Sequence, residues 1–180
     1  MILAIVGISG SGKDTIAKYI NKKYNIPMLV SYTTRPKRDY ETDGVQHWFI
    51  SKDKMNKIKH NEDLLAYTKN DKTEIEYCAT KAQVEGKDII YTINPHGIYW
   101  LKEHCPDVKM VTIMVKPDKY ACTERLRSRG DDETVLQLRL TSEIEEFEQF
   151  YVYGDYDYLV NNNGTLEDLY AQIDSIMKEV

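Results

Sequence analysis

The chain has 180 residues, of which 42% are hydrophobic and 29% charged, and it carries a formal net charge of −5 at pH 7. These values are ordinary for a soluble globular protein and predict one compact domain with a proper core. The acidic balance argues against general binding of nucleic acid, because that function favours a basic surface.

Nothing in the apolar pattern indicates a membrane protein. No apolar run approaches the length that spans a bilayer, and the first residues lack the basic region and cleavage site of a signal peptide. Cys78, Cys105 and Cys122 are odd in number and lack the spacing of a metal site, which favours reduced, structural thiols. We therefore expect a cytoplasmic protein.

The first predicted element is a strand at Ile2–Val6, an apolar and β-branched run suited to burial on both faces of a sheet. The stretch GISGSGKDT follows at residues 7–15, and apolar residues then recur at helical spacing over 13–24. Glycines in such a loop let backbone N–H groups turn inward around an anion, and the helix start adds its positive dipole end. A plain turn is the alternative, but strand, spacing, lysine and helix together indicate a nucleotide-phosphate site.

We expect this loop to bind ATP, with Lys13 reaching the β- and γ-phosphates. A phosphate loop usually has Ser or Thr directly after its lysine, where the hydroxyl contacts magnesium. Here Asp14 stands at that position, and a hydroxyl follows only at Thr15. The ATP-binding residues predicted in this loop are Gly7, Ser9, Gly10, Ser11, Gly12, Lys13, Asp14 and Thr15.

The rest of the chain alternates between strand and helix patterns, which predicts an α/β fold with a mostly parallel sheet. Gly164 and Thr165 offer an N-cap before the last helix. The further strands are expected at 28–30, 88–93, 108–115 and 158–160, and the further helices at about 96–104, 117–128, 133–150 and 166–179.

Two stretches depart from this alternation. Residues 31–86 are polar, with a short helical pattern near 52–60, and predict an inserted substrate-binding part. Residues 129–133 read RGDDE and predict a mobile turn between two helices. Both are candidates for parts that close over substrates.

Two clusters of basic residues stand out in an acidic chain. Arg35 and Arg38 flank Pro36 and Lys37, and two guanidinium groups can hold one phosphate, with Ser31 and Tyr77 as neutral donors. An exposed basic turn is the alternative.

In the second cluster, Arg125 and Arg129 are four residues apart, so they can point the same way on a helix. Arg139 follows on the next predicted helix. Such groups can stabilise the charge of a transferred phosphoryl group, although a solvated helix face is again the alternative.

Taken in order, GISGSGKDT, SYTTRPKRDYETDG, RLRSRGDDE, the RL at 139–140 and YDYLVNN resemble the guanylate kinase family of nucleoside monophosphate kinases. The resemblance covers about residues 2–175, and TTRPKR with the following E-x-x-G is its most specific part. It implies a phosphate-loop kinase core (1–30, 87–124 and 141–180), an inserted NMP-binding subdomain (31–86) and a small lid (about 125–140).

The resemblance also implies roles for individual residues. Asn161 falls in the loop that family members use near the adenine of ATP, and His47 stands where the family usually has a phosphate-contacting tyrosine. The acceptor-binding residues implied are Ser31, Arg35, Arg38, His47 and Tyr77. The catalytic residues implied are Lys13, Arg125, Arg129 and Arg139.

The guanine-reading positions depart from the family. A guanine reader needs hydrogen-bond acceptors, preferably a carboxylate, and the family's glutamate aligns near Leu65. The family's Ser or Thr two places after Tyr77 is replaced by Ala79, and an Asp-x-Asp pattern by Thr92-Ile93-Asn94. Glu74 or Glu76 are candidate substitutes for the reader.

The loss of those strand-end acids suggests that a carboxylate has moved into the phosphate loop. In this interpretation Asp14 holds magnesium directly or through one of the ion's waters. The alternative is that Asp14 only favours the positive end of the first helical turn.

We therefore predict a Mg²⁺-dependent transfer of the ATP γ-phosphoryl group to a nucleoside monophosphate, with GMP or dGMP as the first acceptor. The expected partners are ATP and the monophosphate, without nucleic acid or membrane, in a monomer or simple homodimer. Three alternatives stay open: altered base specificity, a ribose 1,5-bisphosphate phosphokinase, and a binding module without ATP. The intact Lys13 counts against the last.

Overall fold

The structure is a computed structural model, and it describes residues 1–71, 73–116, 118–128 and 133–180. Its central sheet contains four parallel strands in the order β6-β1-β7-β8. They are β1 (Ile2–Val6), β6 (Ile89–Ile93), β7 (Met110–Lys116) and β8 (Tyr158–Asn161). Every residue of β1 is buried, as its apolar run predicts for a strand covered on both faces.

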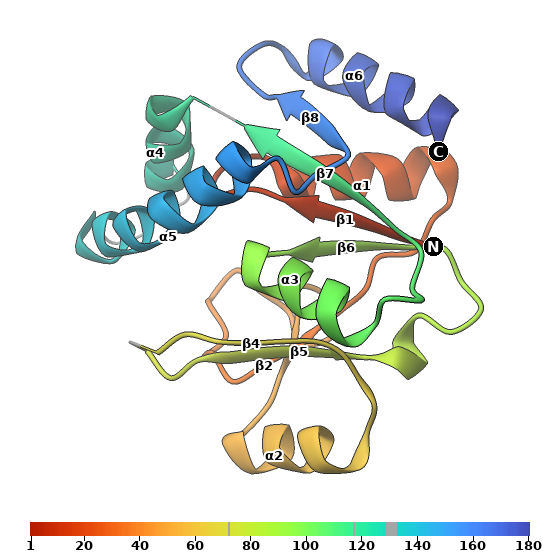
Figure 1. Ribbon diagram of the computed structural model, residues 1–180. Coiled ribbons are helices and arrows are strands. Elements are labelled where there is room, and N and C mark those ends of the chain that lie inside the picture. Colours follow the sequence, from red (N-terminus) through yellow and green to blue (C-terminus); the bar gives the residue numbers. More distant parts are fainter. Residues whose placement is uncertain (72, 117, 129–132) are drawn as a thin grey trace.

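Helices cover both faces of this sheet (Figure 1). Leu3 and Ile5 of β1 pack against α1 (Lys13–Tyr24) and α6 (Leu166–Glu179). Ala4 and Val6 share the opposite cluster with residues of α3 (Pro95–His104) and α5 (Glu133–Tyr153). The remaining core helix is α4 (Lys119–Ser128). Alternation of side chains along one strand thus sorts the helices into two layers.

A second sheet forms within residues 31–86, in the order β3-β2-β5-β4. Its strands are β2 (Tyr32–Thr33), β3 (Trp48–Phe49), β4 (Leu64–Lys69) and β5 (Glu76–Thr80), and the single-turn helix η1 (Lys81–Gln83) follows.

The two faces of this second sheet are covered differently. On one face, α2 (Lys52–Asn61) buries Met55 and Ile58 with Cys78. On the other face, Leu65, Ala66 and Ala79 join the core cluster that contains α3. The second sheet is therefore attached to α3 and the central sheet by packed side chains.

The predicted α/β fold is confirmed, with differences at element ends. The strand predicted at 28–30 is wrong: Met28 forms only an isolated bridge with Ile90. Pro27 has no N–H to donate to a neighbouring strand. The chain therefore makes only a few backbone hydrogen bonds with β6, at Pro27 and Leu29, before it continues to β2. The predicted turn at 129–133 lies almost entirely outside the described residues. The division into core, NMP-binding subdomain and lid stays a proposal.

Other sequence predictions can be followed in detail. Thr165 caps α6 through a capping box in which its hydroxyl accepts from the N–H of Asp168. The three cysteines are free and buried, and burial raises the pKa of Cys122 to about 11. In the described part of the chain, no helix is long and apolar enough to cross a membrane.

Candidate functional site: a phosphate loop facing an arginine cluster

The loop between β1 and α1 turns at the carboxyl edge of the central sheet. Gly10 and Gly12 have φ values of +79° and +95°. A Cβ atom at Gly12 would lie 2.3 Å from Nδ2 of Asn162, and one at Gly10 would lie 2.8 Å from the carbonyl of Cys122. Both positions therefore need glycine for conformation and for space.

Helix α1 begins at Lys13, and no side chain caps its first turn. Lys13, Asp14 and Thr15 are its first three residues, so their N–H groups lie at the positive end of the helix dipole. The ammonium of Lys13 is half-buried and contacts the carbonyl of Ile8 at 3.4 Å. This is the arrangement that binds phosphate in helix-preceding loops.

Ser11 takes part in the loop through its backbone. Its side chain is fully buried, and its hydroxyl has no hydrogen-bond partner among the described residues. A Cβ atom at Gly7 would lie 2.5 Å from this hydroxyl oxygen, so the serine packs against the glycine. The backbone N–H of Ser11 donates to the carbonyl of Ile8 at 3.0 Å, so neither polar group of this residue is directed at an open site here.

Two side chains from other elements support the loop. Asn162, only 6% exposed, donates to the carbonyl of Ser11 at 2.7 Å. Arg125 of α4 donates to the carbonyls of Gly10 and Asn162, both at 3.2 Å. The predicted catalytic Arg125 thus lies directly against the phosphate loop.

Asn162 was not predicted from the sequence, although its neighbour Asn161 was. Asn161 is exposed, and its backbone N–H and carbonyl both bond the side chain of Gln172. The run of asparagines after β8 signals a polar loop, but only the strand register shows which one reaches inward.

Glu143 of α5 is a second residue that the sequence did not reveal. Its carboxylate accepts the backbone N–H of Ser9 at 2.6 Å and the Ser9 hydroxyl at 2.8 Å. An isolated glutamate on a charged helix gives no signal of such a contact.

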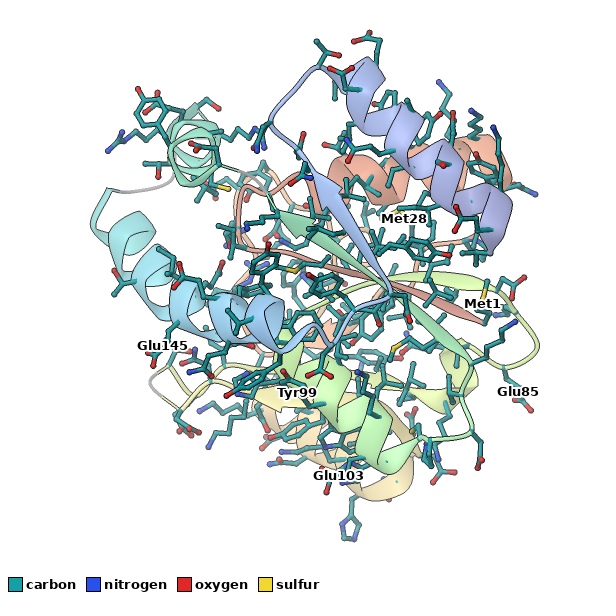
Figure 2. All side chains as sticks on the ribbon, turned by 45° about the horizontal axis from the view of Figure 1, so that its top comes forward. Met1, Met28, Glu85, Tyr99, Glu103 and Glu145 are labelled. Carbon is teal, nitrogen blue, oxygen red and sulfur yellow. The ribbon has the colours of Figure 1, made fainter. Side chains whose placement is uncertain are left out.

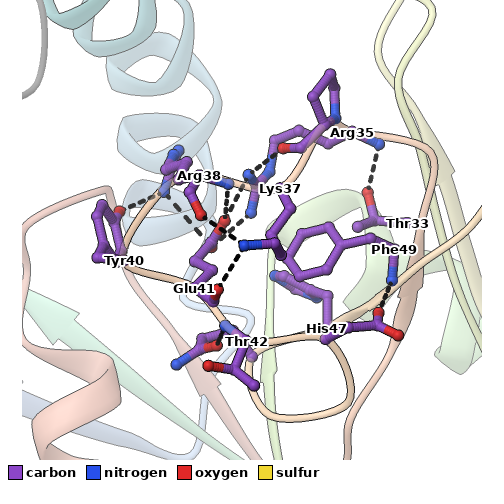
Figure 3. A network of polar contacts seen from close by, with 12 residues as sticks. Thr33, Arg35, Lys37, Arg38, Tyr40, Glu41, Thr42, His47 and Phe49 are labelled. Carbon is purple, nitrogen blue, oxygen red and sulfur yellow. Dashed lines mark hydrogen bonds and ion pairs between the residues drawn. The ribbon is translucent and has the colours of Figure 1, made fainter.

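The basic cluster of Arg35, Lys37 and Arg38 is organised around Glu41, the glutamate of the E-x-x-G element (Figure 3). Its carboxylate forms a two-pronged ion pair with Arg35, at 2.9 and 2.7 Å, and accepts the backbone N–H of Arg38 at 2.8 Å. The side chains of Arg35 and Glu41 are 11% and 4% exposed. Nη1 of Arg38 donates to the Tyr40 hydroxyl at 2.9 Å.

This geometry changes the interpretation of the basic stretch. Arg35 is held in place by a buried carboxylate, whereas Pro36, Lys37 and Tyr40 of the same segment are exposed. Burial would lower the pKa of Arg35, but the hydrogen bonds with Glu41 raise it. Burial would likewise raise the pKa of Glu41, and the bonds from Arg35 and Arg38 lower it below its usual range. Both groups are therefore charged at neutral pH.

Ser31, His47 and Tyr77 lie beside this cluster. Ser31 is 5% exposed, and its hydroxyl lies 2.9 Å from Nδ1 of His47. The imidazole ring meets the ring of Tyr77 edge-on at a centroid distance of 5.6 Å. Burial, followed by the positive charge of Arg35, lowers the pKa of His47 to about 4, while Asp14 acts in the opposite direction. The carboxylate of Asp14, in the first turn of α1, is thus one of the charges that act on His47.

We expect that, with His47 replaced by asparagine, the protein loses less of its free energy of unfolding on acidification than the parent does. The unfolded histidine takes up a proton near pH 6.5, whereas the folded one does so only near pH 4. The free energy of unfolding of the parent therefore decreases as pH falls through this window, by on the order of 3 kcal/mol at its acid end. Urea titrations at pH 7.5 and 4.5 measure the difference, and an identical loss in parent and variant would contradict the buried neutral ring.

The positions expected to read a guanine, Leu65, Ala79 and Asn94, carry no carboxylate. Leu65 and Ala79 are fully buried in the core. Asn94 caps α3 by accepting the N–H of Gly97 at 2.9 Å. Glu76 bonds Lys59 of α2 and the Tyr67 hydroxyl, at 2.5 and 2.6 Å.

Glu76 is therefore directed at Lys59 of α2 and at Tyr67. The other candidate reader, Glu74, forms an exposed ion pair with Lys69 at 2.6 Å. Neither glutamate is placed to take over a base-reading role in this structure.

The described residues do not show the position of every predicted feature. Arg129 lies outside the described residues, and Arg139 belongs to α5 but its side chain lies outside the described part. In the part of the chain that is described, no cluster of three or more potential metal ligands occurs. The predicted closing of a lid over the substrates stays a proposal.

A cavity of about 820 Å³ lies at the opposite edge of the central sheet. Met1, Glu85, Lys87, Asp88 and Lys109 are among the residues that line it, and two of them are labelled in Figure 2. None of the predicted site residues lines this cavity, so the candidate site is the phosphate loop and the basic cluster.

Comparisons with known proteins show which family the chain belongs to. The family model described as guanylate kinase matches residues 1–180. The guanylate kinase of Agrobacterium fabrum is 30% identical over 183 residues, which cover 99% of this chain and 81% of that protein. The guanylate kinase of Clostridioides difficile is 31% identical over 171 residues, covering 90% and 80%.

A crystal structure of guanylate kinase from Anaplasma phagocytophilum superposes with a TM-score of 0.70 at 18% identity, covering 99% of this chain and 85% of that one. At this identity the likeness concerns the fold. The family match and the two sequence relatives show that the chain also shares ancestry with guanylate kinases. The chain belongs to the guanylate kinase family of nucleoside monophosphate kinases.

Proposed function

We propose that the protein transfers the γ-phosphoryl group of ATP to a nucleoside monophosphate, with GMP or dGMP as the first acceptor to test. The observation that carries this proposal is the phosphate loop with Lys13 at the start of α1, in the same chain as a cluster of Arg35 and Arg38 that the buried Glu41 holds in place. The relatives named guanylate kinase support the choice of acceptor.

In this function the loop N–H groups and Lys13 hold the phosphates of ATP, and Asn161 lies near the adenine. Ser31, Arg35, Arg38, His47 and Tyr77 bind the phosphate of the acceptor. We further propose that Arg125, Arg129 and Arg139 stabilise the charge on the transferred group. The acceptor oxygen is already ionised at neutral pH, so positioning and electrostatics suffice without a general base or a covalent intermediate.

The residues of the loop fit a magnesium ion that arrives with the nucleotide. Mg²⁺ is usually held by one or two carboxylates together with phosphates and waters. Asp14 supplies one exposed carboxylate in the first turn of α1, beside Lys13. Asp14 would hold the ion directly or through a water, and the ion would supply positive charge to the phosphates of ATP.

We expect substitution of Asp14 to change the magnesium dependence of the reaction. If the carboxylate holds the ion, Asp14→Asn should raise the Mg²⁺ concentration needed for half-maximal rate, and Asp14→Ser should partly restore it. Initial rates over a magnesium titration measure this. If both variants keep the parent's dependence and shift the melting temperature only slightly, Asp14 acts as an acid at the helix end, worth about 0.3–1 kcal/mol.

A panel of acceptors tests the function itself. ADP release is measured with all common ribo- and deoxyribonucleoside monophosphates and with ribose 1,5-bisphosphate. We expect turnover of GMP or dGMP with relaxed selectivity for guanine, because a buried polar reader gives strong discrimination and Leu65 supplies none. Turnover of the sugar bisphosphate alone would refute a nucleotide acceptor, and no turnover of any acceptor would refute the kinase.

The remaining features of the proposal concern the protein in solution. We propose a cytoplasmic protein that binds ATP and the monophosphate, without nucleic acid or membrane partners, as a monomer or simple homodimer. Light scattering after size-exclusion chromatography tests the oligomeric state.

A further inference from the structure

The contact between Glu143 and Ser9 joins α5 to the phosphate loop. Each carboxylate oxygen takes one donor of Ser9: Oε2 accepts the N–H at 2.6 Å and Oε1 accepts the hydroxyl at 2.8 Å. Both side chains are partly buried, so water competes less for these bonds than at an open surface. Hydrogen bonds to a carboxylate are shorter and about twice as strong as neutral ones.

The position of this carboxylate matters because Ser9 lies inside the loop whose N–H groups are assigned to phosphate. One N–H group cannot donate fully to a carboxylate and to a phosphate oxygen at the same time. The two anions would also repel each other at hydrogen-bond distance. Glu143 and the phosphates of a nucleotide therefore exclude one another at Ser9.

We propose that Glu143 is an internal competitor for the phosphate loop, which the phosphates of ATP must displace before they can bind. The inference rests on the proposed ATP site. A nucleotide can bind only to molecules in which Glu143 has left Ser9. The apparent affinity for ATP is therefore the intrinsic affinity multiplied by the fraction of such molecules. If that fraction is about one in ten to one in a hundred, affinity falls roughly tenfold to a hundredfold.

Isothermal titration calorimetry with a non-hydrolysable ATP analogue and Mg²⁺ tests the competition directly. Glu143→Ala should tighten binding of the analogue by about tenfold or more, and Glu143→Gln by less, because the amide keeps one oxygen acceptor without the charge. Alanine favours helix, so the variant should fold. The matched control is Glu145→Ala, an exposed acid on the same helix (Figure 2), for which we expect an unchanged dissociation constant.

A double-mutant cycle separates displacement from the mere removal of a negative charge. Ser9→Ala removes one of the two donors, so the gain from Glu143→Ala should be smaller in that background. An equal gain in both backgrounds would show that charge alone acts, and would overturn the proposal. So would an unchanged affinity of the Glu143→Ala variant for the analogue.

The same titrations distinguish this inference from the proposed function. Binding to the parent with no effect of Glu143→Ala would refute the internal competitor and leave the ATP site intact. No binding to the parent or to any variant would refute the ATP site, and the competitor with it.

Discussion

Replacing Lys13 by alanine is expected to lower kcat/KM for phosphoryl transfer by about a hundredfold or more while the protein stays folded. Loss of one preorganised donor to the transferred group typically raises the barrier by about 3 kcal/mol. Lys13 makes one long contact with the carbonyl of Ile8, so its removal should cost little stability. Coupled ADP-release kinetics and a thermal melt on the same preparation measure both effects.

The matched control for this variant is Lys18→Ala, since Lys18 is an exposed lysine on the same helix, α1. We expect its kinetics to equal those of the parent. Near-normal turnover in the Lys13→Ala protein would remove the basis of the kinase proposal, whatever the control shows.

Replacing Glu41 by alanine should have the largest effect on stability, and it should also impair the acceptor site. Its carboxylate is buried against the guanidinium of Arg35, and removal of one partner leaves the other as an unpaired buried charge. Such a loss costs about 3–5 kcal/mol of unfolding free energy. Released from Glu41, Arg35 would also lose the geometry in which it is proposed to bind the acceptor phosphate.

Two further variants make this prediction specific. Asp39→Ala removes an exposed acid from the same segment and should change the free energy of unfolding by about 0.5 kcal/mol or less. Arg38→Ala should raise the KM for the acceptor with little effect on ATP binding, because Arg38 is proposed to contact only the phosphate of the acceptor. Its side chain is 30% exposed and bonds the Tyr40 hydroxyl, so its loss should cost less stability than the loss of Glu41. A loss in Glu41→Ala no larger than in Asp39→Ala would contradict the structural role of Glu41.

The central fold could be predicted because its signals are local. Apolar β-branched runs, helical spacing and the loop glycines placed β1, α1, β6, β7, β8 and α6 close to their observed bounds. The strand expected at 28–30 failed because strand formation there depends on partners distant in sequence, and only Met28 pairs with β6.

The site was predicted unevenly for a similar reason. The roles of the phosphate-loop residues and of Arg35 could be predicted because these residues lie in short sequence motifs. Glu41 was part of a motif without an assigned role, and its burial against Arg35 appears only in three dimensions. Asn162 and Glu143 reach the loop from elements 151 and 134 residues away, respectively, and single residues at such separation leave no pattern in one sequence.

The shared packing of Leu65, Ala66 and Ala79 with α3 also limits how this enzyme can be redesigned. These side chains belong to the same core cluster as Ile98 and Leu101 of α3. An acceptor-side sheet transplanted from another family member would bring foreign shapes into a fully packed interface, where overpacking typically costs about 1–3 kcal/mol. A graft that exchanges residues 31–86 should therefore retain these three positions.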